Sequence, residues 1–190
     1  MSDCVRRWTK FWSSVDSRLV LGSRIFNVLF LCTANSARSI LAEAILNHIA
    51  GRQFRGHSAG SRPSGVVHPT ALQLLAQLDI PVLGLRSKGW GEFARPGAPA
   101  MDFVFTICDE ARREAVPIWP GQPISGHWGI KDPVATIGTE VERMQAFREA
   151  FKMIETRVSL FVNLRLDALD PASLQAQLEE IERYHVAVGK

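Results

Sequence analysis

The segment that most restricts the fold is a short apolar run that leads directly into a helical pattern. Residues 25–31 (IFNVLFL) are apolar and contain no turn residue, which predicts a strand buried in a parallel sheet. Residues 38–50 (RSILAEAILNHIA) follow after a short polar loop and predict a helix that ends before Gly51. A buried strand followed so closely by a helix is the start of a βαβ unit, in which a second parallel strand lies beside the first.

The rest of the chain repeats this alternation. Further strands are predicted at 54–61, 101–108 and, inside the Pro- and Gly-rich segment 117–133, near 125–128; further helices are predicted at 68–79, 138–164 and 170–184. Thr139, with Glu142 as the return acid of a capping box, and Asp170 are suited to cap the last two helices. Strands that alternate with helices predict an α/β fold, in which ligands bind beyond the carboxyl ends of the strands.

The composition is that of one globular domain, with 190 residues of which 46% are hydrophobic and 22% charged. We expect a basic N-terminal extension at 1–24, a catalytic α/β domain at 25–168, and a C-terminal helix and tail at 169–190. The extension holds the whole excess of positive charge and also Trp8, Phe11 and Trp12, which would suit a membrane surface or nucleic acid. A loosely ordered tail is the simpler interpretation, so neither partner is expected.

Cysteine content and hydropathy indicate in which cellular compartment the protein is expected. No apolar run approaches the roughly 20 residues of a membrane-spanning helix, and no secretion signal is recognisable at the N-terminus. The three cysteines, Cys4, Cys32 and Cys108, are too few and too scattered for a disulfide scaffold or a zinc site. We therefore expect reduced thiols, no metal, and a cytoplasmic protein.

The loop of residues 32–39 (CTANSARS) carries the most specific chemistry. It joins the first strand to the N-terminus of a helix, where backbone N–H groups and the helix dipole favour a tetrahedral oxyanion. The same field lowers the pKa of a nearby thiol, so we expect Cys32 to be a thiolate nucleophile. Arg38 could bind two oxygens of the anion, Ser39 could donate to the sulfur, and Asn35 could brace the loop. Cys108 ends another predicted strand, so both thiols could face one crevice.

A plainer interpretation of this loop and a second motif elsewhere in the chain compete with the catalytic hypothesis. Cys32 could be a small buried hydrophobe and Arg38 a surface charge, because a bare C-x5-R spacing often arises by chance. Gly89–Ala94 (GWGEFA) fits the loose dinucleotide-binding pattern, but it follows no convincing strand and Trp90 crowds the phosphate position, so a surface turn is favoured.

Several spaced motifs resemble a known family. VLFLCTANSARS and IKDPVA are similar to the low-molecular-weight tyrosine phosphatase superfamily, and HWGIKDP, FTICDEA, IWPGQP and SAGSRP to its arsenate reductase branch, over about residues 25–165. The resemblance implies a three-layer sandwich, with a four-stranded parallel sheet flanked by helices, and reduction of arsenate to arsenite with residual phosphatase activity. It implies that Cys32 is the nucleophile, Arg38 the oxyanion-binding arginine and Asp132 the general acid. The substrate-binding residues would be Thr33, Ala34, Asn35, Ser36, Ala37, Arg38 and Ser39.

The resemblance does not decide the role of the second thiol, Cys108. In many relatives another cysteine follows the equivalent of Cys108, but Val116 stands there in this chain. Either Cys108 attacks Cys32 and forms a disulfide, or a small thiol such as glutathione or mycothiol attacks the arsenic adduct. The Val116 substitution favours the small thiol, with a glutaredoxin-type or thioredoxin-type partner as the external reductant and no tightly bound cofactor. Cys108 would otherwise be an inert buried cysteine.

Ala34 is a second departure, because the family usually has glycine there; alanine would be strained if the position required a positive φ.

Two other functions remain. A tyrosine phosphatase would use the same Cys32, Arg38 and Asp132, but no aromatic residue follows Asp132-Pro133 to hold a phosphotyrosine ring, although Trp90 or Trp128 could line a cleft. A non-catalytic oxyanion-binding module would need neither a thiolate nor an acid, and Asp132-Pro133 alone could be a plain turn.

Overall fold

The computed structural model describes residues 24–114, 117–166 and 168–184. Almost all of the predicted N-terminal extension, including Cys4 and its three aromatic residues, lies outside the described residues, as does Val116. The predicted boundaries of the extension, domain and tail stay predictions.

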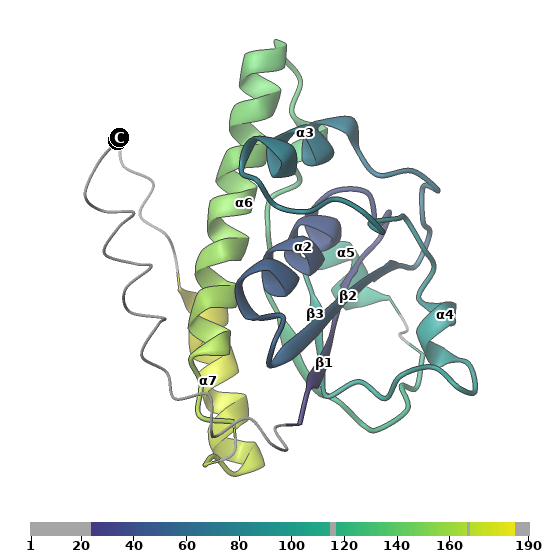
Figure 1. Cartoon of the computed structure of the whole chain (residues 1–190), viewed down its shortest axis with the longest axis vertical. Coiled ribbons are helices and arrows are strands. Elements are labelled where there is room, and N and C mark those ends of the chain that lie inside the picture. Colours follow the sequence, from purple (N-terminus) through teal and green to yellow (C-terminus); the bar gives the residue numbers. More distant parts are fainter. Residues whose placement is uncertain (1–23, 115–116, 167, 185–190) are drawn as a thin grey trace.

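The sheet has four parallel strands in the order β2-β1-β3-β4. They are β1 (Phe26–Cys32), β2 (Phe54–Gly60), β3 (Phe103–Thr106) and β4 (Ile124–His127) (Figure 1). The register pairs Cys32 with Gly60, Leu31 with Thr106, and Thr106 with His127, so the carboxyl ends of all four strands lie along one edge. This edge is where ligands bind in open parallel sheets.

One face of the sheet carries the larger helical layer. It contains α2 (Arg38–Ala50), α3 (Pro69–Gln77), the long α6 (Glu140–Val162) and α7 (Pro171–Arg183) (Figure 1). Aromatic rings fill the space between these helices and the strands: Phe105 stacks on Trp128 at 4.2 Å between ring centroids and meets Phe161 at 5.1 Å. Because α7 buries Leu174, Leu178 and Ile181 in the same hydrophobic core, it is packed as part of this layer.

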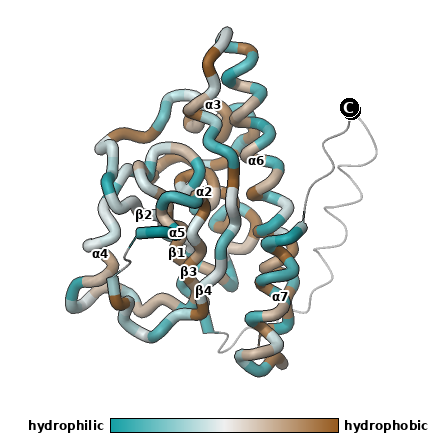
Figure 2. Tube along the Cα trace, turned by 180° about the vertical axis from the view of Figure 1, so that it is seen from behind, coloured by the Kyte–Doolittle hydropathy of each residue, from teal (hydrophilic) through white to brown (hydrophobic). Residues whose placement is uncertain are grey.

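The opposite face has a thinner cover. Alternate residues of β1, Leu29 and Leu31, point to this side, where they pack with Phe93 of the short helix α4 (Gly91–Ala94) and with Trp119. The short helix α5 (Asp109–Arg113) begins directly after Cys108, beyond the end of β3. In the tube view the strands at the centre are largely apolar, while the helices and outer loops mix polar and apolar positions (Figure 2). The three-layer sandwich with its four-stranded parallel sheet is thus confirmed, with layers of unequal thickness.

Local signals in the sequence account for the longer elements. Thr139 and Glu142 form the predicted capping box at the start of α6, and Asp170 accepts hydrogen bonds from the N–H groups of Ala172 and Ser173. The elements that the sequence did not predict are α4, α5 and the 3₁₀ turn Pro133–Ala135, each too short to show a helical period.

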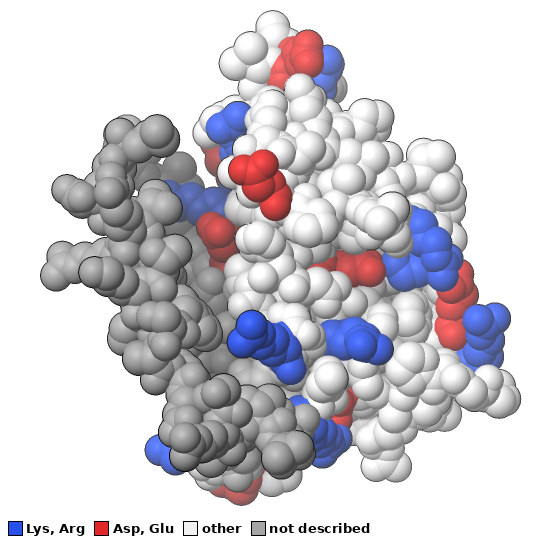
Figure 3. Space-filling model, viewed as in Figure 1, with Lys and Arg blue, Asp and Glu red and all other residues white. Residues whose placement is uncertain are grey.

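No helix in the described part of the chain is long and apolar enough to cross a membrane. On the face shown in Figure 3, basic and acidic side chains are interspersed, with no large patch of a single sign.

Candidate active site

Residues Thr33–Ala37 form a bend between β1 and α2 at the carboxyl edge of the sheet. Asn35 adopts a left-handed backbone conformation with φ of 46°, and Asn tolerates this region better than most residues. Ala34 is not among the residues of positive φ, so the absence of glycine there causes no backbone strain. Gly60, the register partner of Cys32, lies so close to the bend that a Cβ would collide with the Thr33 carbonyl oxygen.

The carbonyl groups of the loop face the segment that follows β2. Thr33 O accepts from the N–H of Arg62 at 3.0 Å, Ala34 O from Ser64 at 2.9 Å, and Ser36 O from His68 at 2.8 Å. Because the N–H of a trans peptide points away from its C=O, the N–H groups that follow these carbonyls point toward the loop interior. The N–H of Asn35 follows this geometry and donates to Cys32 Sγ at 3.1 Å. The bend therefore presents an anion-binding concavity beside the sulfur.

Cys32 is almost completely buried, with 3% of its surface exposed. Burial raises the pKa of its thiol above the usual value, and the nearby Cys108 acts in the same direction. The hydrogen bond with Ser39 Oγ at 2.9 Å, the N–H of Asn35 and the charge of Arg38 act to lower it. The prediction of a lowered pKa is therefore wrong for this arrangement, because burial outweighs the three stabilising groups.

Arg38 and Asp132 are brought together, as a catalytic site requires. The guanidinium of Arg38 donates from Nη2 to Asp132 Oδ2 at 2.9 Å and from Nη1 to the carbonyl oxygen of Ile130 at 3.0 Å. Asp132 also accepts from the N–H of Val134 at 3.1 Å, which fixes the carboxylate at the start of the 3₁₀ turn. Its side chain is 40% exposed, so it can meet an incoming substrate.

Cys108 lies beside Cys32, as the strand-end argument predicted. The two buried cysteines and Ala111 form one contact cluster, and both thiols are free. Cys108 Sγ accepts from the N–H of Ala111 at 3.4 Å as the N-cap of α5, and it lies 3.6 Å from Thr33 Oγ1. Two thiols, a guanidinium and a carboxylate thus converge around one anion-binding loop.

Comparison with known proteins agrees with this geometry. The family described as low molecular weight phosphotyrosine protein phosphatase matches residues 27–179. The chain belongs to this family. An arsenate reductase of Oceanobacillus iheyensis is 31% identical over 70% of this chain and 93% of the relative. A solved arsenate reductase in its oxidized state is 26% identical, with a TM-score of 0.57 over 70% of this chain and 93% of that one. The resemblance to the arsenate reductase branch is confirmed by these relatives.

The fold of the family extends to more distant structures. The tyrosine phosphatase Wzb from Escherichia coli K30, solved in complex with sulphate, is 18% identical, with a TM-score of 0.56 over 70% of this chain and 93% of that one. This likeness shows the shared fold alone.

The two tryptophans considered for a phosphotyrosine site both pack against hydrophobic clusters. Trp128 is fully buried in the aromatic core, so it cannot line a cleft. Trp90 packs against the opposite face of the sheet at the start of α4, where the GWGEFA segment forms a turn and a short helix.

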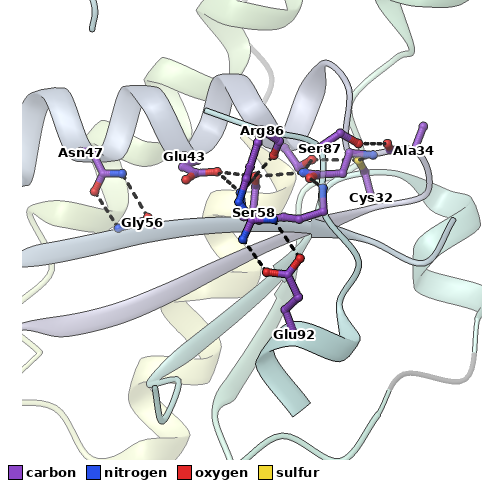
Figure 4. A network of polar contacts seen from close by, with 12 residues as sticks. Cys32, Ala34, Glu43, Asn47, Gly56, Ser58, Arg86, Ser87 and Glu92 are labelled. Carbon is purple, nitrogen blue, oxygen red and sulfur yellow. Dashed lines mark hydrogen bonds and ion pairs between the residues drawn. The ribbon is translucent and has the colours of Figure 1, made fainter. Parts of the chain in front are cut away.

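Glu43, Ser58 and Lys88 support the loop, and of these three residues sequence reasoning missed Lys88. They come from α2, from β2 and from the coil before α4, and hydrogen bonds join Ser58 to Asn35, Glu43 and Lys88. Figure 4 shows Glu43 and Ser58 within this polar network, close to Cys32. The types and spacing of these three residues form no local motif in the sequence. Among the described residues, no cluster of three or more His, Cys, Asp or Glu could hold a metal ion.

Proposed function

We propose that this protein reduces arsenate to arsenite, with Cys32 as the nucleophile. The observation that carries the proposal is the convergence of Cys32, Cys108, Arg38 and Asp132 on one anion-binding loop. The chain's similarity to arsenate reductases, over most of the length of those relatives, supports arsenate as the substrate. A tetrahedral dianion would bind to the inward N–H groups of the loop and to the planar guanidinium of Arg38.

The first chemical step is substitution at arsenic. Because burial raises the pKa of Cys32, the thiol keeps its proton until the anion arrives. The arsenate dianion is the base next to the thiol, and it accepts this proton. The thiolate, which accepts hydrogen bonds from Ser39 and the N–H of Asn35, attacks arsenic. Asp132, in its protonated form, donates its proton to the leaving hydroxyl group, which departs as water. Arsenic, still As(V), remains bound covalently to Sγ, and Asp132 is left as a carboxylate.

The second step transfers two electrons to arsenic. Contact between the two buried cysteines favours attack by the Cys108 thiolate on Cys32 Sγ. The electron pair of the S–As bond then passes to arsenic, As(V) becomes As(III), and arsenite leaves. A Cys32–Cys108 disulfide remains, and an external dithiol protein of the thioredoxin or glutaredoxin type reduces it.

The second candidate for the reduction step is attack by a small thiol, and an observation in the sequence supports it. Val116 stands where many relatives have the cysteine that carries the disulfide onward, so glutathione or a similar thiol would instead attack the arsenic adduct. A glutaredoxin-type protein would then reduce the mixed species. The substrate chemistry at Cys32 is the same in both routes.

Turnover with defined reductants tests the proposal. The purified full chain is incubated with arsenate and either glutathione with glutaredoxin or thioredoxin with its reductase, and arsenite is measured. Arsenite formation that Cys32→Ser abolishes is expected. Rapid hydrolysis of p-nitrophenyl phosphate without any arsenite would instead establish the phosphatase activity, and binding of phosphate without either reaction would establish a binding module.

Cys108→Ser separates the two routes, with Cys4→Ser as the matched control. The disulfide route predicts that Cys108→Ser loses turnover with every reductant while Cys4→Ser retains it. Unchanged turnover of Cys108→Ser with glutathione would exclude an obligatory internal disulfide.

A further inference from the structure

The short helix α5 carries the second thiol, and two contacts outside the anion loop hold this helix in place. Cys108 is the N-cap of α5, is only 1% exposed, and shares a contact cluster with Cys32. A helix of five residues has little stability of its own, because the first turn of a helix is unfavourable to form. The position of Cys108 therefore depends on the groups to which α5 is attached.

The first contact joins α5 to the end of β4. His127 Nε2 donates to Asp109 Oδ1 at 3.0 Å, since a carboxylate can only accept. The other ring nitrogen, Nδ1, lies 2.8 Å from Thr106 Oγ1, so the buried imidazole is held from both sides. The pair lies against Gly129, where a Cβ would be 3.1 Å from His127 Nε2 and 3.2 Å from Asp109 Oδ1. Asp109 is thereby attached to the edge strand of the sheet.

The second contact joins α5 to α7, which packs against β4 (Figure 2). Arg112 Nη1 donates to Glu182 Oε1 at 3.3 Å. The last turn of α7 is itself held by Arg157 of α6, whose buried guanidinium donates to the carbonyl oxygens of Glu182 at 3.1 Å and of Gly129 at 3.3 Å. Glu182 thus presents its carboxylate to α5 from a fixed backbone. The match with the family ends at residue 179, so Glu182 lies beyond it.

Both contacts are made by one face of α5. Asp109 and Arg112 are three residues apart, and residues with this spacing are neighbours on a helix surface. Ala111, on a different face, is fully buried against the two cysteines. The helix is therefore held by β4 and α7 on one side while it touches both thiols on another.

We propose that four residues of this arrangement position Cys108, namely Asp109 and Arg112 of α5, His127 of β4 and Glu182 of α7. They hold α5 between β4 and α7, and so keep the Cys108 thiol in contact with Cys32. In the disulfide route the S–S bond forms as the S–As bond breaks, and its electron pair passes to arsenic. The four residues act by raising the effective concentration of the attacking thiol. The inference rests on the proposed function for the role of Cys108 as that thiol.

The variant Asp109→Ala/Arg112→Ala removes the α5 side of both contacts, and both side chains are exposed, so no core residue is changed. Glu110→Ala/Arg113→Ala is the matched control. It removes the same two charges from exposed positions of the same helix, and neither residue has an ion-pair partner in the described part of the chain. All proteins carry Cys4→Ser, so that Cys32 and Cys108 are the only thiols.

The main readout is an equilibrium in a glutathione buffer, without arsenate. Glutathione disulfide forms a mixed disulfide with Cys32, and Cys108 then displaces glutathione from it. The Cys32–Cys108 bond forms, the bond to glutathione breaks, and glutathione leaves as its thiol. The ratio of internal to mixed disulfide, measured by mass spectrometry at a fixed glutathione concentration, reports the effective concentration of Cys108 at Cys32.

Two further readouts report on Cys32 alone. They are the pH profile of its alkylation by iodoacetamide, followed by mass spectrometry of its peptide, and its protection from alkylation by inorganic phosphate. Both should be the same in every variant, because the four residues contact α5 and not the anion loop. Unchanged values therefore separate the positioning of Cys108 from general damage to the site.

Asp109→Ala/Arg112→Ala should lower the ratio of internal to mixed disulfide about fivefold, a modest change because partly exposed ion pairs are individually weak. Glu110→Ala/Arg113→Ala should leave the ratio unchanged. Asp109→Asn/Arg112→Lys, which keeps an acceptor for His127 and a cation for Glu182, should recover most of it. Glu182→Ala tests the contact from the α7 side and should lower the ratio about twofold, with the exposed Glu180→Ala as its control.

An unchanged or higher ratio in Asp109→Ala/Arg112→Ala, or an equal loss in Glu110→Ala/Arg113→Ala, would overturn the proposal. A parent protein that forms only the mixed disulfide would also overturn it, and arsenite formation by that protein would leave the proposed function standing through the small-thiol route. A parent protein that forms no arsenite, but whose disulfide ratio responds to these variants as expected, would contradict the proposed function and support this inference.

Discussion

Arg38, the first residue of α2, donates to the Asp132 carboxylate at 2.9 Å across a sequence separation of 94 residues. The same guanidinium donates to the carbonyl oxygen of Ile130, so Arg38 fixes the segment that carries the proposed acid. One arginine therefore orients Asp132 and faces the anion loop. A bound dianion would share this guanidinium with Asp132, and the acid would lie next to the oxygen that it protonates.

Arg38→Lys is expected to lower kcat/KM for arsenate by about 100-fold or more, because lysine lacks the planar fork that can engage two oxygens at once. Lysine also cannot hold Ile130 and Asp132 together in the same geometry. Steady-state kinetics of arsenite formation measures the effect, and Arg148→Lys, on the exposed side of α6, is the control. Similar losses in both variants would contradict a specific role for Arg38.

Asp132→Asn should separate catalysis from binding. The amide cannot protonate the leaving oxygen, so kcat should fall by about 10²–10⁴-fold, the range typical for loss of a general acid. Phosphate should bind as well as before or more tightly, because a negative charge next to the anion has been removed. Turnover and phosphate protection of Cys32 are the two measurements, and equal losses in both would argue that Asp132 acts in binding alone.

The elements that position the site were predictable because their signals are local. The apolar run before Cys32, the helical period after Arg38 and the capping box at Thr139 each lie within one short segment. The proximity of Cys108 to Cys32 followed from topology, since both residues lie at the carboxyl ends of adjacent parallel strands. Family resemblance supplied Asp132, which spacing alone could not distinguish from a turn residue.

The place of Lys88 in the supporting network was not predicted, because burial of individual polar groups is a tertiary property. Lys88 lies in a coil with no helical or strand period, and an isolated lysine is ordinarily exposed. Its partners Glu43 and Ser58 come from two different elements. The direction of the Cys32 pKa shift also depended on how deeply the sulfur is buried, which the loop sequence does not record.

Stability should depend on pH through His57. Burial, followed by the charges of Lys88 and Arg55, lowers its pKa to about 4 in the folded protein, against 6.5 for a free histidine. Between these values the unfolded chain binds a proton that the folded protein does not, so the free energy of unfolding should decrease as the pH falls from 6.5 to about 4. His57→Gln should lose this contribution, whereas the exposed His48→Gln should retain it. Urea unfolding across this pH range checks the slope, and parallel curves for the wild type and His57→Gln would contradict it.

Ser39→Ala tests the hydrogen bond that opposes the effect of burial on Cys32. Burial raises the pKa of the Cys32 thiol, and the hydrogen bond with the Ser39 hydroxyl has the largest effect among the interactions that lower this pKa. Removal of the hydroxyl should therefore raise the pKa of Cys32 further. At a given pH below the midpoint, less Cys32 would be thiolate, and both alkylation and arsenate turnover should slow, with partial recovery at higher pH.

Ser173→Ala, at the start of α7, is a control of the same chemical change at an exposed position. Recovery of the rate at higher pH distinguishes a titration effect from a damaged loop, because a misfolded loop would stay slow at every pH. An alkylation profile of Ser39→Ala that coincides with the wild type would show that the Asn35 N–H and Arg38 suffice to stabilise the sulfur anion.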